Sequence, residues 1–243
     1  NGLMDFGFIP LVAGSKIVAL WHGMGFKLVY NGKLHGKTLF LKKTLDHLFS
    51  WTYRNITLAT SQHTVHSLET NFTLKKSGIH ITGQPRNDVL FKVNRKQILN
   101  SIGIDEHKKA IIYMPTYKGT VANRKDEKQK RDVNAFLNKL DLKLNDNQVL
   151  FVKFHPFNQS QIDFSSFSHI KAFPEGFENY DVLNTADVLI TDYSSVFFDF
   201  ANTKRKIILF NYDEQEYLKD RGIYIPLEDL PFPKVQSIDD LIH

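Results

Sequence analysis

The chain has 243 residues, of which 42% are apolar, so it can bury the core of one large or two modest domains. No apolar run approaches the roughly 18 residues of a membrane-spanning helix, and the first residues lack the charged-then-apolar order of a signal peptide. The absence of Cys excludes disulfides and thiolate chemistry, and it fits a cytosolic protein.

The formal net charge of +5 is unevenly distributed along the chain. Residues 1–95 contain 12 Lys and Arg against 4 Asp and Glu, whereas residues 96–243 contain 19 against 22. A basic half indicates an anionic partner such as phosphate, nucleic acid or an acidic membrane surface. The aromatic residues of this half lie in apolar runs more than among Lys and Arg, so we expect no nucleic-acid partner.

Short apolar, β-branched runs predict seven buried strands. In chain order they are 16–20, 56–59, 78–82, 110–114, 148–154, 187–190 and 206–210. Stretches with helical spacing separate most of them, for example 41–49 and 136–140. This alternation predicts an α/β fold in which helices cover both faces of parallel sheets.

Two sets of strands lie on either side of the segment 91–109, where the charge also changes sign. We therefore predict two domains, 1–94 and 95–243. If two such domains face one another, their ligands are expected at the carboxyl ends of the strands. The mixed-sign run 124–132 is expected to be an exposed loop.

Polar or small residues follow the predicted strands at those ends. The set contains imidazoles, a guanidinium and hydroxyls, and it includes His22, Gly23, Arg86, Thr116, His155, Ser194 and Ser195; Asp192, at the same end, is expected to be a loop or cap residue. Groups of these kinds bind anions, so the inventory favours phosphate chemistry. Among the Asp and Glu residues, no clustered carboxylates of the kind that hold phosphate-bound Mg²⁺ are visible in the sequence.

The stretch LITDYSSVFFDF, 189–200, predicts a strand that turns into a helix from Ser194 to Thr203. The two serines can cap this helix, or their hydroxyls and the free amides of the first turn can bind phosphate. Asp199 lies one turn after Ser195 on the same face, where it can accept a hydrogen bond from a ligand alcohol or pair with Lys204 or a neighbouring loop.

An ordered set of motifs resembles the CDP-glycerol glycerophosphotransferase family of teichoic acid polymerases and primases. The motifs are WHGMGFK, TGQPRND, MPTYKG, KFHP, DVLITDYSSVFFDF and YLKDRGIYIPLEDLPFPKV, and the likeness runs from about residue 17 to the end. The resemblance implies a GT-B-like fold of two facing Rossmann-like domains, with an acceptor-side N-terminal domain, expected to be incomplete here, and a C-terminal domain that binds the donor nucleotide. Met24 and Gly25 depart from the family, which commonly has Thr and Pro there.

The resemblance implies transfer of glycerol phosphate from CDP-glycerol to a hydroxyl of a lipid-linked primer or a growing teichoic acid or capsule polymer, with release of CMP. It implies His22 as the general base and His155 as the group that stabilises phosphate charge. Alternatively, Arg86 can form an ion pair with Asp88 or another carboxylate. We also expect no cofactor beyond the CDP-activated alditol. The residues expected to bind the donor are Gly23, Met24, Gly25, Lys27, Arg86, Thr116, Ser194, Ser195 and Asp199.

Alternatives stay open at this point. The donor can be CDP-ribitol, since both donors carry the same CDP group. The chain can also be a GT-B nucleotide-sugar glycosyltransferase or epimerase, or a binding module that uses its basic half to bind a membrane or nucleic acid. The basic stretch 36–55 can lie on an anionic membrane surface or simply cover a sheet. With a lipid-linked acceptor, we expect a peripheral protein at the inner face of the cell membrane.

Overall fold

The computed structural model describes residues 16–20, 36–41, 44, 54–71, 76–92, 95–116, 127–154, 162–220, 223 and 225–242. The chain forms two compact units. The first comprises Asn1–Pro85 with Gln215–Leu230, and the second comprises Arg86–Glu214 with Pro231–His243. The assignment of residues 1–94 and 95–243 to acceptor-side and donor-binding domains stays a prediction.

The first unit contains a three-stranded parallel sheet in the order β1-β2-β3. Its strands are β1 (Lys16–Ala19), β2 (Arg54–Ala59) and β3 (Ile79–Ile81). Helix α2 (Gln62–Asn71) follows β2 and packs Val65 and Leu68 against Ala59 and Ile79. Other described elements that fall at least partly in this unit include η4 (Lys76–Gly78), α9 (Glu214–Asp220) and η7 (Leu227–Asp229).

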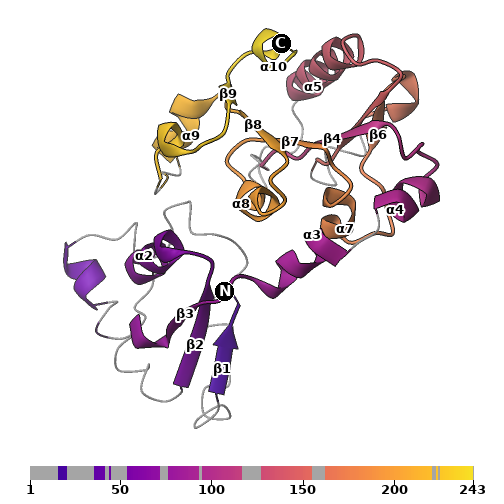
Figure 1. The fold of residues 1–243 in the computed structure, drawn as a ribbon. Coiled ribbons are helices and arrows are strands. Elements are labelled where there is room, and N and C mark those ends of the chain that lie inside the picture. The colour runs from indigo at the N-terminus through magenta and orange to yellow at the C-terminus, as the bar shows by residue number, and fades with distance from the viewer. Residues whose placement is uncertain are drawn as a thin grey trace. The chain divides into compact units, whose positions relative to one another are not determined.

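The second unit contains a six-stranded parallel sheet in the order β6-β5-β4-β7-β8-β9 (Figure 1). Its strands are β4 (Lys109–Tyr113), β5 (Gln148–Val152), β6 (Ile170–Ala172), β7 (Val188–Thr191), β8 (Lys206–Phe210) and β9 (Lys234–Val235). Every pairing in both sheets is parallel. The α/β fold with parallel sheets that the sequence predicts is confirmed.

Helices cover both faces of this sheet. On one face α5 (Glu127–Asp141) and α10 (Ile238–Ile242) lie together, and on the other lie α7 (Asn179–Leu183) and α8 (Val196–Ala201) (Figure 1). Side chains alternate along β4, where Ile111 and Tyr113 join the core under α5. The segment that enters this unit contains η5 (Pro85–Asp88), α3 (Val89–Lys92) and α4 (Arg95–Ser101), and η6 (Phe164–Ser166) precedes β6.

The charged run 124–132 was expected to be an exposed loop, and this was wrong for its last six residues. Helix α5 begins at Glu127, so the residues from there onward are helical. A run of mixed charge is compatible with a helix as well as with a loop, so the charge pattern alone does not distinguish the two. The apolar residues Leu137 and Leu140 then bury the end of α5 in the core.

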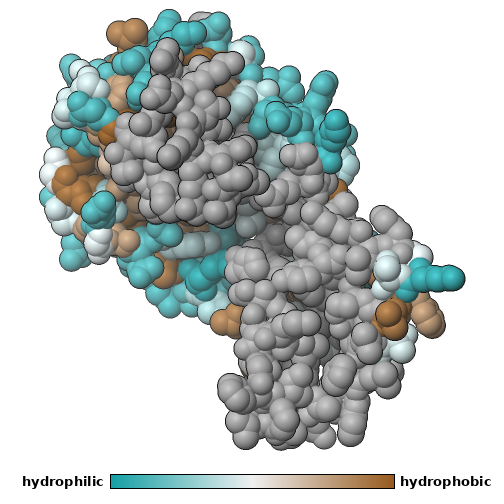
Figure 2. Space-filling view, turned by 180° about the vertical axis from the view of Figure 1, so that it is seen from behind, coloured by the Kyte–Doolittle hydropathy of each residue, from teal (hydrophilic) through white to brown (hydrophobic). Residues whose placement is uncertain are grey.

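The described surface of the second unit is mainly polar in one view. Figure 2 shows teal, hydrophilic side chains over much of the coloured surface, with hydrophobic side chains in small groups among them. None of the helices in the described ranges combines the length and apolar character needed to cross a membrane.

Candidate functional site

Polar side chains gather at the carboxyl ends of the central strands of the second unit. The chain runs outward from β4 to β5 and β6 on one side, and from β7 to β8 and β9 on the other. The edge beyond β4 and β7 is therefore the point where the strand order reverses, which is where sheets of this type bind ligands. Of the residues predicted for the site, Thr116 follows β4, and Ser194 and Ser195 follow β7.

A buried carboxylate fixes the loop after β4 to the end of β7. Oδ1 of Asp192, a residue only 2% exposed, accepts hydrogen bonds from the backbone N–H groups of Thr116 and Tyr193, at 2.8 and 2.6 Å. Thr191 Oγ1 also donates to the carbonyl of Met114 at 2.6 Å. Asp192 therefore holds the two loops in register, which agrees with the loop role that its position suggests.

The hydroxyl of Thr116 is left available by this arrangement. Its backbone N–H is bound to Asp192, whereas its Oγ1 is buried and has no hydrogen-bond partner among the described residues. A buried hydroxyl without a partner costs free energy, so such a group often marks a position where a ligand or water binds. This geometry is compatible with the donor contact predicted for Thr116, which stays a prediction.

The two serines differ in how they meet the start of α8. Ser195 is the N-cap residue, but its side chain makes no capping hydrogen bond, and it is partly exposed. Ser194 Oγ accepts a long hydrogen bond of 3.4 Å from the backbone N–H of Val196. The hydroxyl of Ser195 is thus not engaged in the capping that would otherwise explain a serine here.

Arg86 and Asp199, which lie 113 positions apart in the sequence, form an ion pair. Nη2 of Arg86 lies 3.0 Å from Oδ2 of Asp199, whose side chain is 2% exposed. The hydroxyl of Tyr180, at the start of α7, donates to the same Oδ2 at 2.6 Å. Asp88, the nearer partner that the sequence offers for Arg86, pairs with Lys92 instead.

Two other groups at this edge are perturbed by burial. Tyr193 is fully buried, and its hydroxyl donates to Asp213 at 3.1 Å. Burial is the main cause, and the charge of Asp213 the second cause, of a pKa far above the usual value for this tyrosine.

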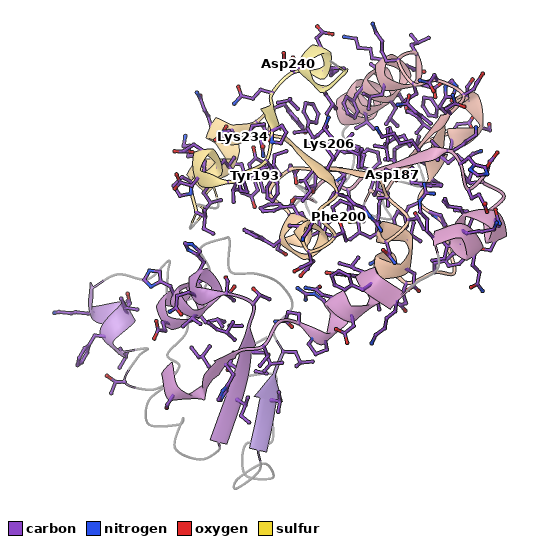
Figure 3. The ribbon with its side chains drawn as sticks, viewed as in Figure 1. Asp187, Tyr193, Phe200, Lys206, Lys234 and Asp240 are labelled. Atoms are coloured by element: carbon purple, nitrogen blue, oxygen red, sulfur yellow. The ribbon has the colours of Figure 1, made fainter. Side chains whose placement is uncertain are left out.

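Lys153 follows β5, and its ammonium lies 4.2 Å from the ring centroid of Phe173. Burial lowers the pKa of this lysine. Figure 3 shows Tyr193 and Asp187 at opposite ends of β7.

Several predicted site residues lie outside the described residues: His22, Gly23, Met24, Gly25, Lys27 and His155. Tyr180 and Lys153 were not assigned any role from the sequence. The position of Lys153 directly after a buried strand was a usable signal for it. Nothing in the local pattern connects Tyr180 to Asp199. Within the described ranges, no three His, Cys, Asp or Glu side chains form a group that could hold a metal ion.

Residues 7–243 match the protein family described as CDP-Glycerol:Poly(glycerophosphate) glycerophosphotransferase. The chain belongs to this family. It is 30% identical over 252 residues to a teichoic acid poly(glycerol phosphate) polymerase of Bacillus spizizenii, covering 97% of this chain and 62% of the relative. It is 28% identical over 251 residues to a teichoic acid poly(ribitol-phosphate) polymerase of the same organism, covering 97% of this chain and 39% of the relative.

Solved structures of the same family have the same fold. The structure of the wall teichoic acid polymerase TagF is similar with a TM-score of 0.73 at 25% identity, covering 93% of this chain and 57% of that chain. The GT-B-like architecture that the sequence predicts is thereby confirmed. The chain spans from 39% to 62% of the length of the two curated relatives named above.

Proposed function

We propose that the protein transfers an alditol phosphate from a CDP-activated alditol to a hydroxyl of a lipid-linked primer or of a growing teichoic acid or capsule polymer. The single observation that supports this most is the set of ligand-ready groups at the strand-reversal edge of the second unit. Thr116 Oγ1 has no hydrogen-bond partner among the described residues, the Ser195 hydroxyl makes no capping hydrogen bond, and the Arg86 side chain is partly exposed. Membership of the family supports a CDP-activated alditol as the donor that these groups bind.

The proposed reaction is a displacement at the β-phosphorus of the donor. The acceptor hydroxyl oxygen forms a bond to this phosphorus, and the bond from the phosphorus to the bridging oxygen breaks. The bridging oxygen leaves with CMP, and the acceptor proton passes to His22 as general base. His155 stabilises negative charge on the β-phosphate or on the departing CMP, which is the main task of a protein in phosphoryl transfer.

In this proposal, protein groups of two kinds hold the diphosphate of the donor. Arg86 and Lys27 supply positive charge, and the hydroxyls of Thr116, Ser194 and Ser195 supply hydrogen bonds. Backbone amides of the loop at Gly23, Met24 and Gly25 add further donors. No metal ion or other cofactor is needed to balance the charge in this scheme.

Glycerol phosphate is the group we propose first, because the family is described by that donor. Ribitol phosphate is the second candidate, because a poly(ribitol-phosphate) polymerase is nearly as similar to the chain as the glycerol enzyme. The full-length protein should be incubated with a lipid-linked acceptor and either CDP-glycerol or CDP-ribitol, and CMP should be measured. Release of CMP from one donor supports the proposal and selects the alditol, and release from neither refutes it.

A membrane surface is the proposed location of the acceptor. Phe40 and Leu41 belong to the helical residues 36–41, and they are 75% and 61% exposed beside the exposed Lys37. Exposed apolar and basic side chains together favour the surface of an anionic bilayer. The protein should sediment with anionic vesicles more than with zwitterionic ones, and substitution of Phe40 and Leu41 by Ser should weaken this. Equal sedimentation of the variant and the wild type would argue against this surface.

A further inference from the structure

The carboxylate of Asp199 is buried and holds two donors that come from other elements. Phe197 and Phe200 are fully buried and anchor α8, on which Asp199 lies (Figure 3 marks Phe200). Oδ2 of Asp199 accepts from Arg86 Nη2 at 3.0 Å and from the Tyr180 hydroxyl at 2.6 Å. A carboxylate that is 2% exposed and doubly bound at one oxygen is poorly placed to meet a ligand alcohol.

Tyr180 completes the environment of this ion pair. Its hydroxyl is a second donor to a buried charge that Arg86 alone would not saturate, and the Arg86 guanidinium carbon lies 5.9 Å from the centroid of its ring. Burial, followed by the hydrogen bond to Asp199, raises the pKa of Tyr180 well above its usual range. The hydroxyl therefore keeps its proton and remains a donor throughout the physiological pH range.

Arg86 has binding capacity left after this pairing. One Nη group contacts Asp199, while its Nε is buried and has no hydrogen-bond partner in the described part of the chain. The side chain is 26% exposed, so part of the guanidinium remains accessible. A guanidinium has five N–H donors in a rigid plane, and fixing one edge determines the direction of the others.

We propose that Asp199 and Tyr180 are positioning residues that orient Arg86 toward a phosphate group of the donor. This inference rests on the proposed function, since it takes the donor from there. It replaces the direct contact with a ligand hydroxyl that the sequence predicts for Asp199. Tyr180 acts through Asp199 and Arg86, and its own contact with the ligand is not required.

Tyr180→Phe in the full-length protein is the informative variant, because it removes one oxygen and keeps the ring. The Michaelis constant for the donor should rise about 5- to 10-fold, with kcat changed less than about twofold. This is less than the loss of a whole hydrogen bond to a charged group, because Tyr180 acts on the donor only through Arg86. The matched control is Asp88→Asn, which breaks the exposed Asp88–Lys92 pair beside Arg86 and should leave both constants unchanged.

A double-mutant cycle distinguishes positioning from a purely structural role. In the background of Arg86→Lys, which loses the planar fork, Tyr180→Phe should change the donor Michaelis constant less than about twofold. Additive effects of the two substitutions would overturn the inference. An unchanged Michaelis constant in Tyr180→Phe alone would overturn it as well.

Binding of CDP and of cytidine, measured by calorimetry, separates this inference from the proposed reaction. Tyr180→Phe should weaken CDP binding by the same factor as the Michaelis constant and leave cytidine binding unchanged. If the wild type releases no CMP from either donor but shows this difference, the reaction fails and the positioning role stands. If the wild type binds CDP no better than cytidine, Arg86 holds no phosphate and the positioning role fails.

Discussion

Nη2 of Arg95 lies 2.9 Å from Oδ2 of Asp187, and this same oxygen accepts the backbone N–H of Ala110 at 2.8 Å. The arginine, on α4, thereby joins the starts of β4 and β7. Its remaining donors reach three backbone carbonyls at 2.6 to 3.0 Å, those of Thr185, Glu106 and Lys108. Arg95 is therefore a structural residue at the end of the sheet opposite the candidate site.

Replacement of Arg95 by Ala should lower the free energy of unfolding by about 2–4 kcal/mol, because several partly buried acceptors lose their donor at once. Urea unfolding provides the measurement. Lys96→Ala on the same helix is the control, since the pair of Lys96 with Glu106 involves a mostly exposed lysine and should be worth less than about 1 kcal/mol. Equal effects of the two substitutions would show that Arg95 is an ordinary surface residue.

Ser195→Ala should affect ligand binding without affecting stability. Because the Ser195 side chain makes no capping hydrogen bond, the free energy of unfolding should change by less than about 0.5 kcal/mol, below the usual 0.5–2 kcal/mol for a capping serine. The donor Michaelis constant should rise severalfold. Donor kinetics and urea unfolding of the same preparation test both statements.

Ser237→Ala is the natural comparison for Ser195→Ala. Ser237 Oγ accepts from the backbone N–H of Asp240 at 3.0 Å at the start of α10, which is a true cap. Its loss should cost about 1 kcal/mol of stability and leave donor kinetics unchanged. A destabilised Ser195→Ala protein with normal kinetics would reverse our assignment of the two serines.

Substitution of either histidine of the proposed mechanism should cause the largest loss of activity among the variants. His22→Asn and His155→Ala should each lower kcat by about 10²–10⁴-fold, the range for loss of a general base or of electrostatic stabilisation. CDP binding by His22→Asn should stay within about threefold of the wild type, since the base is not needed to hold the nucleotide. The proposed role of His22 is wrong if kcat survives its substitution.

The lowered pKa of Lys153 predicts that its effect on the free energy of unfolding depends on pH, with a defined sign. Burial lowers its pKa in the folded state, so the folded protein disfavours the charged form that the unfolded chain carries below pH 10.5. The resulting destabilisation is fully present below the lowered pKa and disappears as the pH rises towards 10.5. Lys153→Met should therefore be more stable than the wild type at pH 7, and the difference should shrink at pH 9 and 10.

Urea unfolding of both proteins at each pH measures this difference, in which the titration of other groups cancels. Thioether contact with Phe173 keeps the packing similar in the variant. A stability difference that grows with pH would contradict the sign. A wild type more stable than the variant at pH 7 would mean that the contact of the ammonium with the Phe173 ring outweighs its desolvation.

Continuous apolar runs predicted seven buried strands, and all seven strands exist. Those of the second unit are largely buried, whereas Val18 of β1 and Ile81 of β3 are more than half exposed. The run at 148–154 contains β5, and the run at 206–210 coincides with β8. Strands β6 and β9 were missed since they have three and two residues, and Lys171 and Lys234 are exposed. Short edge strands owe their existence to the neighbouring strand more than to their own composition.

Contacts across long sequence separations were beyond prediction. The sequence allowed Arg86 to pair with Asp88 or with another carboxylate but did not say which, and the fold pairs it with Asp199. Which carboxylate an arginine meets depends on the path of the chain over the 113 sequence positions that separate the two residues. In contrast, the placement of Thr116, Ser194 and Ser195 at strand ends followed from the parallel sheet alone, because parallel strands end at a common edge.

Residues 215–230 belong to the first unit although they follow most of the second unit in the sequence, and this affects folding during synthesis on the ribosome. Strand β9 at Lys234–Val235, which completes the six-stranded sheet, leaves the ribosome only after that excursion. Each unit therefore needs a segment from near the C-terminal end of the sequence before it can finish folding. The first unit cannot be completed before synthesis of the second begins, so the usual domain-by-domain order of co-translational folding does not apply. A nascent chain stalled near residue 214 should expose the open side of β8 to chaperones.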